Sequence, residues 1–212
     1  MLELLLIIIA YLIGSIPTAI WVGKYFFGID VRDYGSGNAG ATNTFRVLGA
    51  RWGSFVMAVD ISKGVIACLL YLLIPYYTMH EFARTNFMIG LGMAAVLGHI
   101  YPIWAGFKGG KGVATVFGMV LAIQPQVGLM VLIIFLLVLF LTRYVSLSSI
   151  LASLSLPIMV LVIFKEPELL YRIFAVAIAV LVIFTHQKNI DRLLKGNENK
   201  VKMNGLKLRK RN

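Results

Sequence analysis

The chain has 212 residues, of which 59% are hydrophobic, and a formal net charge of +11 from 20 Lys and Arg against 9 Asp and Glu. Soluble domains hold roughly 45–50% apolar residues, so this composition excludes an ordinary soluble domain and indicates an integral membrane protein. The charge does not indicate nucleic-acid binding, because no basic stripe interleaved with aromatic residues lies on a polar domain; basic residues beside membrane spans account for it.

Seven apolar segments follow one another along the chain, each long enough for a full, short or broken membrane helix. The first has Glu3 and no basic residue near its start, and no small-residue cleavage site follows, so we expect a retained span. The predicted helices are Leu2–Val22, Trp52–Pro75, Phe87 to about Leu97, Val113–Ile123, Val127–Thr142, Val145–Phe164 and Leu169–Thr185. The predicted polar segments are residues 23–51, Tyr76–Asn86, His99–Gly112, Lys165–Glu168 and the tail from Lys188.

The apolar run from Val113 to Thr142 is too long for one ordinary span. Gln124 and Gln126 flank Pro125 in its middle; proline disfavours helix at the residue before it, and the two amides prefer water. We therefore expect two helices here. The alternative is a bundle of five spans, in which Gly109–Thr142 is one long helix and one weak segment does not cross the membrane.

An odd number of spans puts the termini on opposite sides of the membrane, and the basic residues select the orientation. With the N-terminus outside and the C-terminus in the cytoplasm, 17 basic residues lie inside and three lie outside, as the positive-inside rule requires. All three motifs described below then face the cytoplasm. We expect one membrane domain over residues 1–199 and a basic cytoplasmic tail over residues 200–212.

The first motif runs from Tyr34 to Arg46 and is rich in glycine. Its glycines permit positive φ, so consecutive backbone N–H groups can point into one concavity, and the Arg46 guanidinium offers a fork that matches phosphate. The alternative is a flexible loop with ordinary turn residues. The candidate site residues are Gly35, Ser36, Gly37, Asn38, Gly40, Thr42, Asn43 and Arg46.

The second motif runs from Gly98 to Thr115 and contains Lys111 among glycines just before a predicted helix. Amide groups at a helix N-terminus attract anions, and the lysine adds a full charge, so this segment can bind phosphate. It is not a Walker A loop, because its spacing is one residue short and Gly112 stands where Ser or Thr is required. The alternative is a glycine-rich hairpin with lysines that reach the membrane surface.

The third motif runs from His186 to Glu198. His186, Asn189 and Arg192 recur every third residue, so they share one face of a helix. His186 and Asp191 also have the H-x-x-x-x-D spacing of a large acyltransferase superfamily that uses histidine as a base. On a helix, His186 and Asp191, which are five residues apart, point to different faces, so we interpret this match as coincidence and Asp191 as a surface charge.

Two charged residues, Asp60 and Lys63, lie inside the second predicted span. Charges within a membrane are costly and indicate function, but their three-residue spacing also allows a structural ion pair. Cys68 is the single cysteine of the chain, so it forms no intrachain disulfide, and we expect it to be a small core residue.

Together the three motifs resemble one family, the bacterial acyl-phosphate:glycerol-3-phosphate acyltransferases (PlsY). The resemblance covers nearly the whole chain and rests on the runs G-S-G-N-A-G-A-T-N, G-F-K-G-G-K-G-V-A-T and H-Q-K-N-I-D-R-L-L-K-G-N-E. It implies an all-α bundle of seven transmembrane helices in the bacterial inner membrane, with a cytoplasmic active site. It also implies transfer of a fatty acyl group from acyl phosphate to sn-glycerol 3-phosphate, which gives lysophosphatidic acid and phosphate.

The resemblance assigns roles to residues of all three motifs. It implies no metal and no cofactor, and it leaves room for an upstream enzyme that forms acyl phosphate as a partner. Glu198 matches an acidic position that we expect to be structural. The expected catalytic residues are Ser36, Arg46, Lys111, His186 and Asn189. The expected substrate-binding residues are Gly35, Gly37, Asn38, Gly40, Thr42, Asn43, His99, Lys108, Gly109, Gly110, Gly112, Thr115 and Arg192.

An acyl phosphate is already activated, so the reaction needs no covalent enzyme intermediate; positioning and charge stabilisation suffice. No carboxylate accompanies His186 in sequence to orient it as a base. We therefore expect a substrate phosphate to accept the hydroxyl proton and His186 to bind phosphate.

Two other functions compete with this interpretation. A transporter of a phosphorylated solute would place polar residues deep in several spans, whereas here they gather at one face. A phosphatidyl-alcohol transferase would need clustered aspartates for a divalent metal, and the nine acidic residues are scattered.

Overall fold

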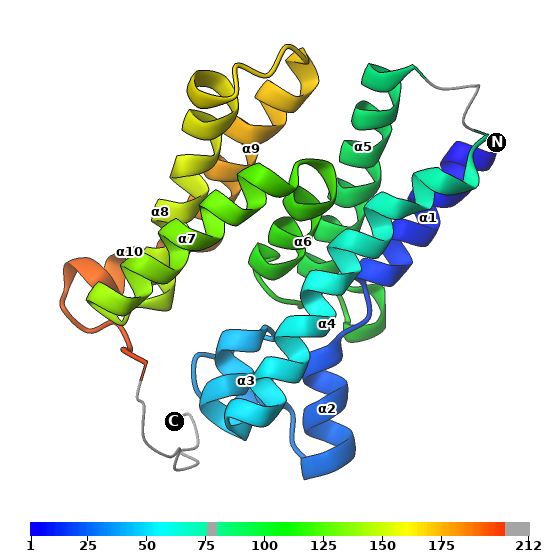
Figure 1. Cartoon of the computed structure of the whole chain (residues 1–212). Helices are drawn as coiled ribbons and strands as arrows, with labels where there is room; N and C mark the ends of the chain where they lie inside the picture. Colours follow the sequence, from blue (N-terminus) through cyan, green and yellow to red (C-terminus); the bar gives the residue numbers. More distant parts are fainter. Residues whose placement is uncertain (76–79, 202–212) are drawn as a thin grey trace.

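The computed structural model describes residues 1–75 and 80–201, and the regular elements of this part of the chain are all helices (Figure 1). Short helical turns at Val31–Asp33 (η1), Leu70–Leu73 (η2), Ile103–Ala105 (η4) and Met159–Ile163 (η5) extend or connect them. The helices are α1 (Leu2–Gly14), α2 (Thr18–Phe27), α3 (Ala41–Leu48), α4 (Ala50–Leu69), α5 (Glu81–Ile100), α6 (Val113–Ile123), α7 (Pro125–Thr142), α8 (Val145–Ile158), α9 (Leu169–Thr185) and α10 (Gln187–Leu194).

Four helical stretches among the described residues are long and apolar enough to cross a membrane: 50–73, 81–105, 125–142 and 145–163. Two bent pairs, α1 with α2 and α9 with α10, raise the number to six if each pair is one span. These residues therefore provide four to six candidate spans, as a multi-pass integral membrane protein requires. The one remaining predicted span, Val113–Ile123, is α6, which has 11 residues and is shorter than a span.

Most predicted helix boundaries agree with the structure, and α6 and α9 agree at both ends. The first predicted span is broken, because Pro17 disfavours helix at Ile16 and cannot donate a backbone hydrogen bond; α1 and α2 bend there by 41°. Two segments predicted as polar connections contain helices: residues 81–86 begin α5, and residues 41–48 form α3. Residues 76–79 of the predicted connection and 202–212 of the predicted tail lie outside the described residues.

Four glycines bring two pairs of helices into close contact. A Cβ atom added at any of them would overlap a backbone carbonyl oxygen of the facing helix, so each pair depends on the absence of a side chain. Both contacts are reciprocal. Between α1 and α5, Gly14 faces Ala95 and Gly98 faces Tyr11; between α4 and α6, Gly64 faces Thr115 and Gly118 faces Ile61.

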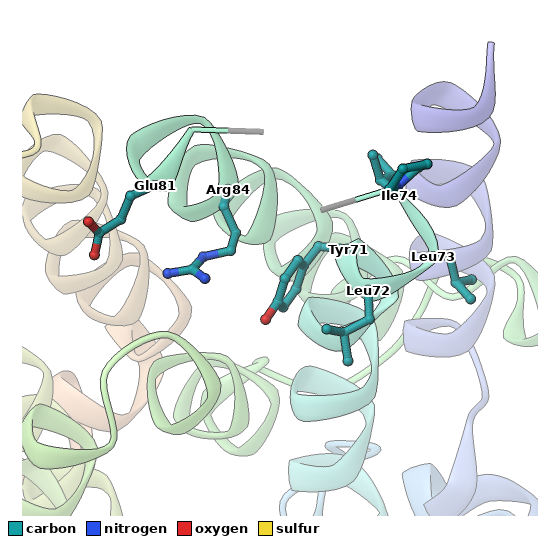
Figure 2. A pocket seen from close by; sticks show the side chains of 7 residues that line it. Tyr71, Leu72, Leu73, Ile74, Glu81 and Arg84 are labelled. Atoms are coloured by element: carbon teal, nitrogen blue, oxygen red, sulfur yellow. The ribbon is translucent and has the colours of Figure 1, made fainter. Parts of the chain in front are cut away.

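A cavity of about 480 Å³ opens where η2 approaches the start of α5 (Figure 2). The guanidinium of Arg84 lies over the ring of Tyr71, 6.0 Å from its centroid. None of the candidate site residues lines this cavity, since the glycine-rich segments lie at the opposite ends of α4 and α5. The lining residues are Tyr71, Leu72, Leu73, Ile74, Pro75, Glu81 and Arg84.

Candidate functional site

The second and third motifs meet through a hydrogen bond between side chains 78 residues apart in the sequence. The Lys111 ammonium, in the loop between α5 and α6, donates to Oδ1 of Asn189 on α10. Arg46, on α3, belongs to the first motif. Its guanidinium interacts electrostatically with Glu198 and Arg192 of the third motif, which connects these two motifs. The structure therefore brings residues of all three motifs to one end of the bundle, where α3, the α5–α6 loop and α10 lie (Figure 1).

Asn43 fixes the shape of the first motif. It is buried, and its Oδ1 accepts from the backbone N–H of Ser36 at 2.8 Å and from the Ser36 hydroxyl at 3.1 Å. Its Nδ2 donates to the carbonyls of Val31 and Tyr34 at 2.8 and 3.2 Å. Gly35 has a φ of +60°, and a Cβ there would overlap Asn43 Oδ1. The Asn43 amide is thus fully engaged within the loop, where it positions Ser36.

Other side chains of the first motif remain available. Asn38, Thr42 and Arg46 are each partly exposed, and within residues 1–75 and 80–201 none of their side chains makes a hydrogen bond. Gly37 has a φ of +74°, which a residue with a side chain adopts only with strain. A guanidinium and short polar groups on one half-buried segment suit an anionic or polyhydroxyl ligand.

The second motif folds back on the end of α5. The N–H groups of Gly109 and Gly110 donate to the carbonyls of Ile100 and His99, both at 3.1 Å. A Cβ on Gly109 would overlap the His99 carbonyl oxygen, and one on Gly110 would overlap His99 Nε2. These two N–H groups therefore do not face a phosphate, contrary to the predicted cradle; close packing against His99 explains why both residues are glycine.

Gly112 is the N-cap of α6 and has a φ of +79°, so it turns the chain from the loop into the helix. Within the part of the chain that the structure describes, no side chain caps this helix end, so its first N–H groups are available to an anion. Thr115 on the first turn is fully buried, and its hydroxyl has no hydrogen-bond partner among the described residues. Lys108, predicted to bind substrate, is exposed.

His186 lies at the 62° bend between α9 and α10 and is buried. Its Nδ1 is 2.8 Å from the carbonyl oxygen of Val182, and since a carbonyl only accepts, Nδ1 carries a proton. Nε2 is then an acceptor in the neutral ring and a donor in the protonated ring. The group that orients this histidine is a backbone carbonyl and not a carboxylate.

Glu198 links α8 and α10 through hydrogen bonds of its side chain. Its Oε1 accepts from Asn189 at 2.8 Å and from Ser146 at 3.1 Å, and its Oε2 accepts from Arg192 at 2.7 Å. Burial alone would raise the pKa of this carboxyl, but the hydrogen bonds from Arg192, Asn189 and Ser146 lower it overall. Glu198 is therefore ionised and holds Asn189, the partner of Lys111.

The electrostatic balance of the cluster is positive. Arg46, Lys111 and Arg192 interact with one carboxylate, that of Glu198. Burial, together with repulsion from Arg192 and Arg46, lowers the pKa of Lys111 to about 8, although Glu198 opposes the shift. A cluster with more positive than negative charge, partly shielded from water, favours a ligand with negative charge.

Sequence reasoning missed the link between the first two motifs, which is Arg32. Its Nε and NH2 groups donate to the carboxylate of Asp30 at 3.0 and 2.8 Å, and its NH1 donates to the carbonyls of Ala105 and Lys108 at 3.1 and 3.2 Å. The Asp-x-Arg spacing could have indicated the local pair. Nothing in the sequence indicates the two carbonyls, which lie 73 and 76 residues away.

The described residues contain no group of three or more His, Cys, Asp or Glu side chains arranged to hold a metal ion. The fold and the site thus define a class: a multi-pass helical membrane protein that gathers cationic and amide side chains into one positively charged cluster at an end of the bundle.

Comparison with known proteins identifies the family within this class. The family model for glycerol-3-phosphate acyltransferase matches residues 4–196. A glycerol-3-phosphate acyltransferase of Fusobacterium nucleatum is 46% identical over 92% of this chain and 96% of its own length. One of Listeria welshimeri is 43% identical over 94% and 96% of the two chains. The chain belongs to the glycerol-3-phosphate acyltransferase family, and the predicted enzyme class is confirmed.

Two solved structures share the fold. The crystal structure of PlsY, an integral membrane glycerol 3-phosphate acyltransferase, in its glycerol 3-phosphate form has a TM-score of 0.84 and 38% identity. The lysophosphatidic acid form of PlsY has a TM-score of 0.80 at the same identity. Each match covers 95% of this chain and 96% of the other. The resemblance to PlsY drawn from the three motifs is therefore confirmed, and with it a role in acyl transfer and phospholipid synthesis.

Proposed function

We propose that this chain transfers the acyl group of a fatty acyl phosphate to the 1-hydroxyl of sn-glycerol 3-phosphate. The observation that supports this most is the cluster of Arg46, Lys111 and Arg192 around the single carboxylate of Glu198. Both substrates carry a phosphate, so a site that holds them together needs more than one cation. The similar PlsY structures are those of the glycerol 3-phosphate and lysophosphatidic acid forms, which are an acceptor and a product of this reaction.

The substrate-contacting groups are Ser36, Arg46, Lys111, His186 and Asn189. Asn43 and Glu198 hold members of this set in position through hydrogen bonds. Asn43 accepts a hydrogen bond from Ser36. Glu198 accepts one from Asn189, which in turn accepts one from Lys111. The N-terminus of α6, beside Lys111, adds backbone N–H donors. No metal or cofactor takes part.

The acceptor hydroxyl oxygen bonds to the acyl carbon as the bond from that carbon to the phosphate oxygen breaks. The departing phosphate takes the hydroxyl proton and leaves as inorganic phosphate, so no enzyme base and no covalent enzyme intermediate is required. His186 is held by the carbonyl of Val182 and not by a carboxylate. That partner supports a binding role in preference to the base role of a carboxylate-oriented histidine. The positive cluster stabilises the charge that develops on the phosphates.

The cluster faces the cytoplasm of a bacterium, with the N-terminus outside and the C-terminus inside. This topology follows if each bent helix pair is one span and α6 is a seventh, short segment; it puts 17 of the 20 basic residues on the inner side. The acyl chain of the donor then lies in the inner leaflet. Residues 1–199 form the one catalytic domain.

Purified protein in lipid nanodiscs is given palmitoyl phosphate and radiolabelled glycerol 3-phosphate. We expect labelled lysophosphatidic acid and one inorganic phosphate per product molecule. Lys111→Met should lower kcat/KM by about 100-fold, a typical loss for one transition-state donor. Lys195→Met is the control, since this lysine is exposed and pairs with Asp191 outside the site, and it should retain activity within threefold. Product formation that depends equally on both lysines would contradict the proposed site, and uptake of label into vesicles without lipid product would indicate a transporter.

A further inference from the structure

Three ionisable side chains are buried together outside the cluster described above. Lys63 Nζ is 2.5 Å from Asp60 Oδ1, and both side chains are 3% exposed. Nδ1 of His99, 7% exposed, is 3.7 Å from the same carboxylate oxygen. Asp60 and Lys63 lie on α4 and His99 on α5. Burying charged groups within a membrane helix costs free energy, so we expect these three side chains to have a role that offsets this cost.

The trio connects segments that the helices alone do not join. Lys63 Nζ also donates to the carbonyl of Ile16 at 2.7 Å, in the break between α1 and α2. On the other side, the His99 ring packs against Gly110: a Cβ added at Gly110 would overlap His99 Nε2. The backbone of His99 also accepts the Gly110 N–H at 3.1 Å. The His99 side chain is thus placed between Asp60 and the residue that precedes Lys111.

We propose that Asp60 and His99 are positioning residues: Asp60 orients the His99 ring, and the ring fixes the 109–110 backbone that places the Lys111 ammonium beside Asn189. The proposal rests on the proposed function only in that Lys111 is taken to contact a substrate. His99, expected from the sequence to bind substrate, has its Nδ1 toward Asp60 and its Nε2 against Gly110, so both ring nitrogens are directed at the protein.

A purely structural role is the alternative, in which the Asp60–Lys63 pair only satisfies the Ile16 carbonyl. The two roles differ in what happens to Lys111. A displaced Lys111 leaves its buried position, and the pKa of its ammonium rises from about 8 toward its ordinary value. The groups that act on this ammonium are Asn189, Glu198, Arg192, Arg46 and His186.

The test uses the whole enzyme in nanodiscs and two variants. Asp60→Asn with Lys63→Met removes both charges at once and leaves no unpaired buried charge. His99→Phe keeps a ring against Gly110 but removes the Nδ1 contact and leaves the ion pair intact. The matched control is Asp191→Asn with Lys195→Met, which makes the same chemical change at an exposed i,i+4 pair.

Competitive acetylation across pH 6 to 11, read by peptide mass spectrometry, gives the pKa of Lys111 without reference to activity. We expect both test variants to shift the Lys111 midpoint upward by at least one pH unit and to lower kcat/KM by about 10- to 100-fold, as small misplacements do. The control should change neither. A folded His99→Phe protein with the wild-type midpoint and kcat/KM within twofold would overturn the proposal. A shifted midpoint with unchanged kcat/KM would support the positioning and contradict the role of Lys111 in the proposed function.

Discussion

Replacing Glu198 by Gln tests how the positive cluster is held together. Gln keeps the size of the side chain but offers one acceptor oxygen and one NH₂ group. In the wild type all three neighbours donate: Asn189 and Ser146 to Oε1, and Arg192 to Oε2. Whichever way the amide turns, its NH₂ faces a donor, so at least one hydrogen bond is lost. The positive charges of Arg46, Lys111 and Arg192 also lose their shared counter-charge.

The cost follows from these contacts. A hydrogen bond to a charged group contributes about 1.5–3 kcal/mol, and breaking a fully buried ion pair costs about 3–5 kcal/mol. The Arg192 side chain is 34% exposed while that of Glu198 is 1% exposed, so the lower part of the range applies. We expect the free energy of unfolding to fall by about 2–3 kcal/mol, which corresponds to a Tm lower by about 4–12 °C for a chain of this size.

The cysteine of the chain allows thermal unfolding of both proteins to be followed. Cys68 is its only cysteine and is fully buried, so a thiol-reactive dye reports unfolding on heating. Asp191→Asn is the control, since its carboxylate is exposed and, among the described residues, pairs with Lys195 alone; we expect a change within about 0.5 kcal/mol. Equal melting temperatures for Glu198→Gln and the wild type would refute the assigned role of Glu198.

Three further predictions address Lys111, Arg32 and the α4–α6 contact. Lys111 has a pKa lowered to about 8, and the proposed function requires its ammonium form to bind phosphate, so kcat/KM should be highest below pH 8 and fall as pH rises through that value; a flat profile to pH 10 would contradict this. Arg32→Lys keeps the charge but not the fork that reaches Asp30 and two carbonyls, so kcat/KM should fall about 10-fold with little loss of expression. Gly118→Ala should lower the free energy of unfolding by about 1–3 kcal/mol through overlap with α4, whereas Gly90→Ala, in open space on α5, should raise it by about 0.5–1 kcal/mol; similar thermal melts would count against the close packing.

Much of the fold was predictable because apolar runs and their interruptions are local properties. The Gln124–Pro125 break separates α6 from α7 as predicted, and α7 begins two residues earlier than predicted because Pro125 is tolerated at the first helical position. The same reasoning applied to Pro17 would have found the break between α1 and α2. It was missed because the flanking residues are apolar and the run reads as one span.

Sequence patterns predicted which residues belong to the site better than they predicted which of those residues contact one another. The three motifs indicated which segments carry charge and glycine, and the structure brings Arg46, Lys111 and Asn189 to one end of the bundle. The partners of Arg32 and the place of His99 depend on how distant helices cross, and no local pattern encodes that. The packing roles of Gly109 and Gly110 were likewise hidden, since a glycine required for contact and one required for a ligand look the same in sequence.

The proposed reaction requires one site in which separate segments of the chain hold phosphate together. The measurement that tests it most directly is an experimental structure of the protein with glycerol 3-phosphate bound. We predict the phosphate within hydrogen-bonding distance of the side chains of Arg46 or Lys111, or of both, at the end of the bundle where α10 begins. A phosphate found instead beside Arg84, in the cavity between η2 and α5, would contradict the account (Figure 2).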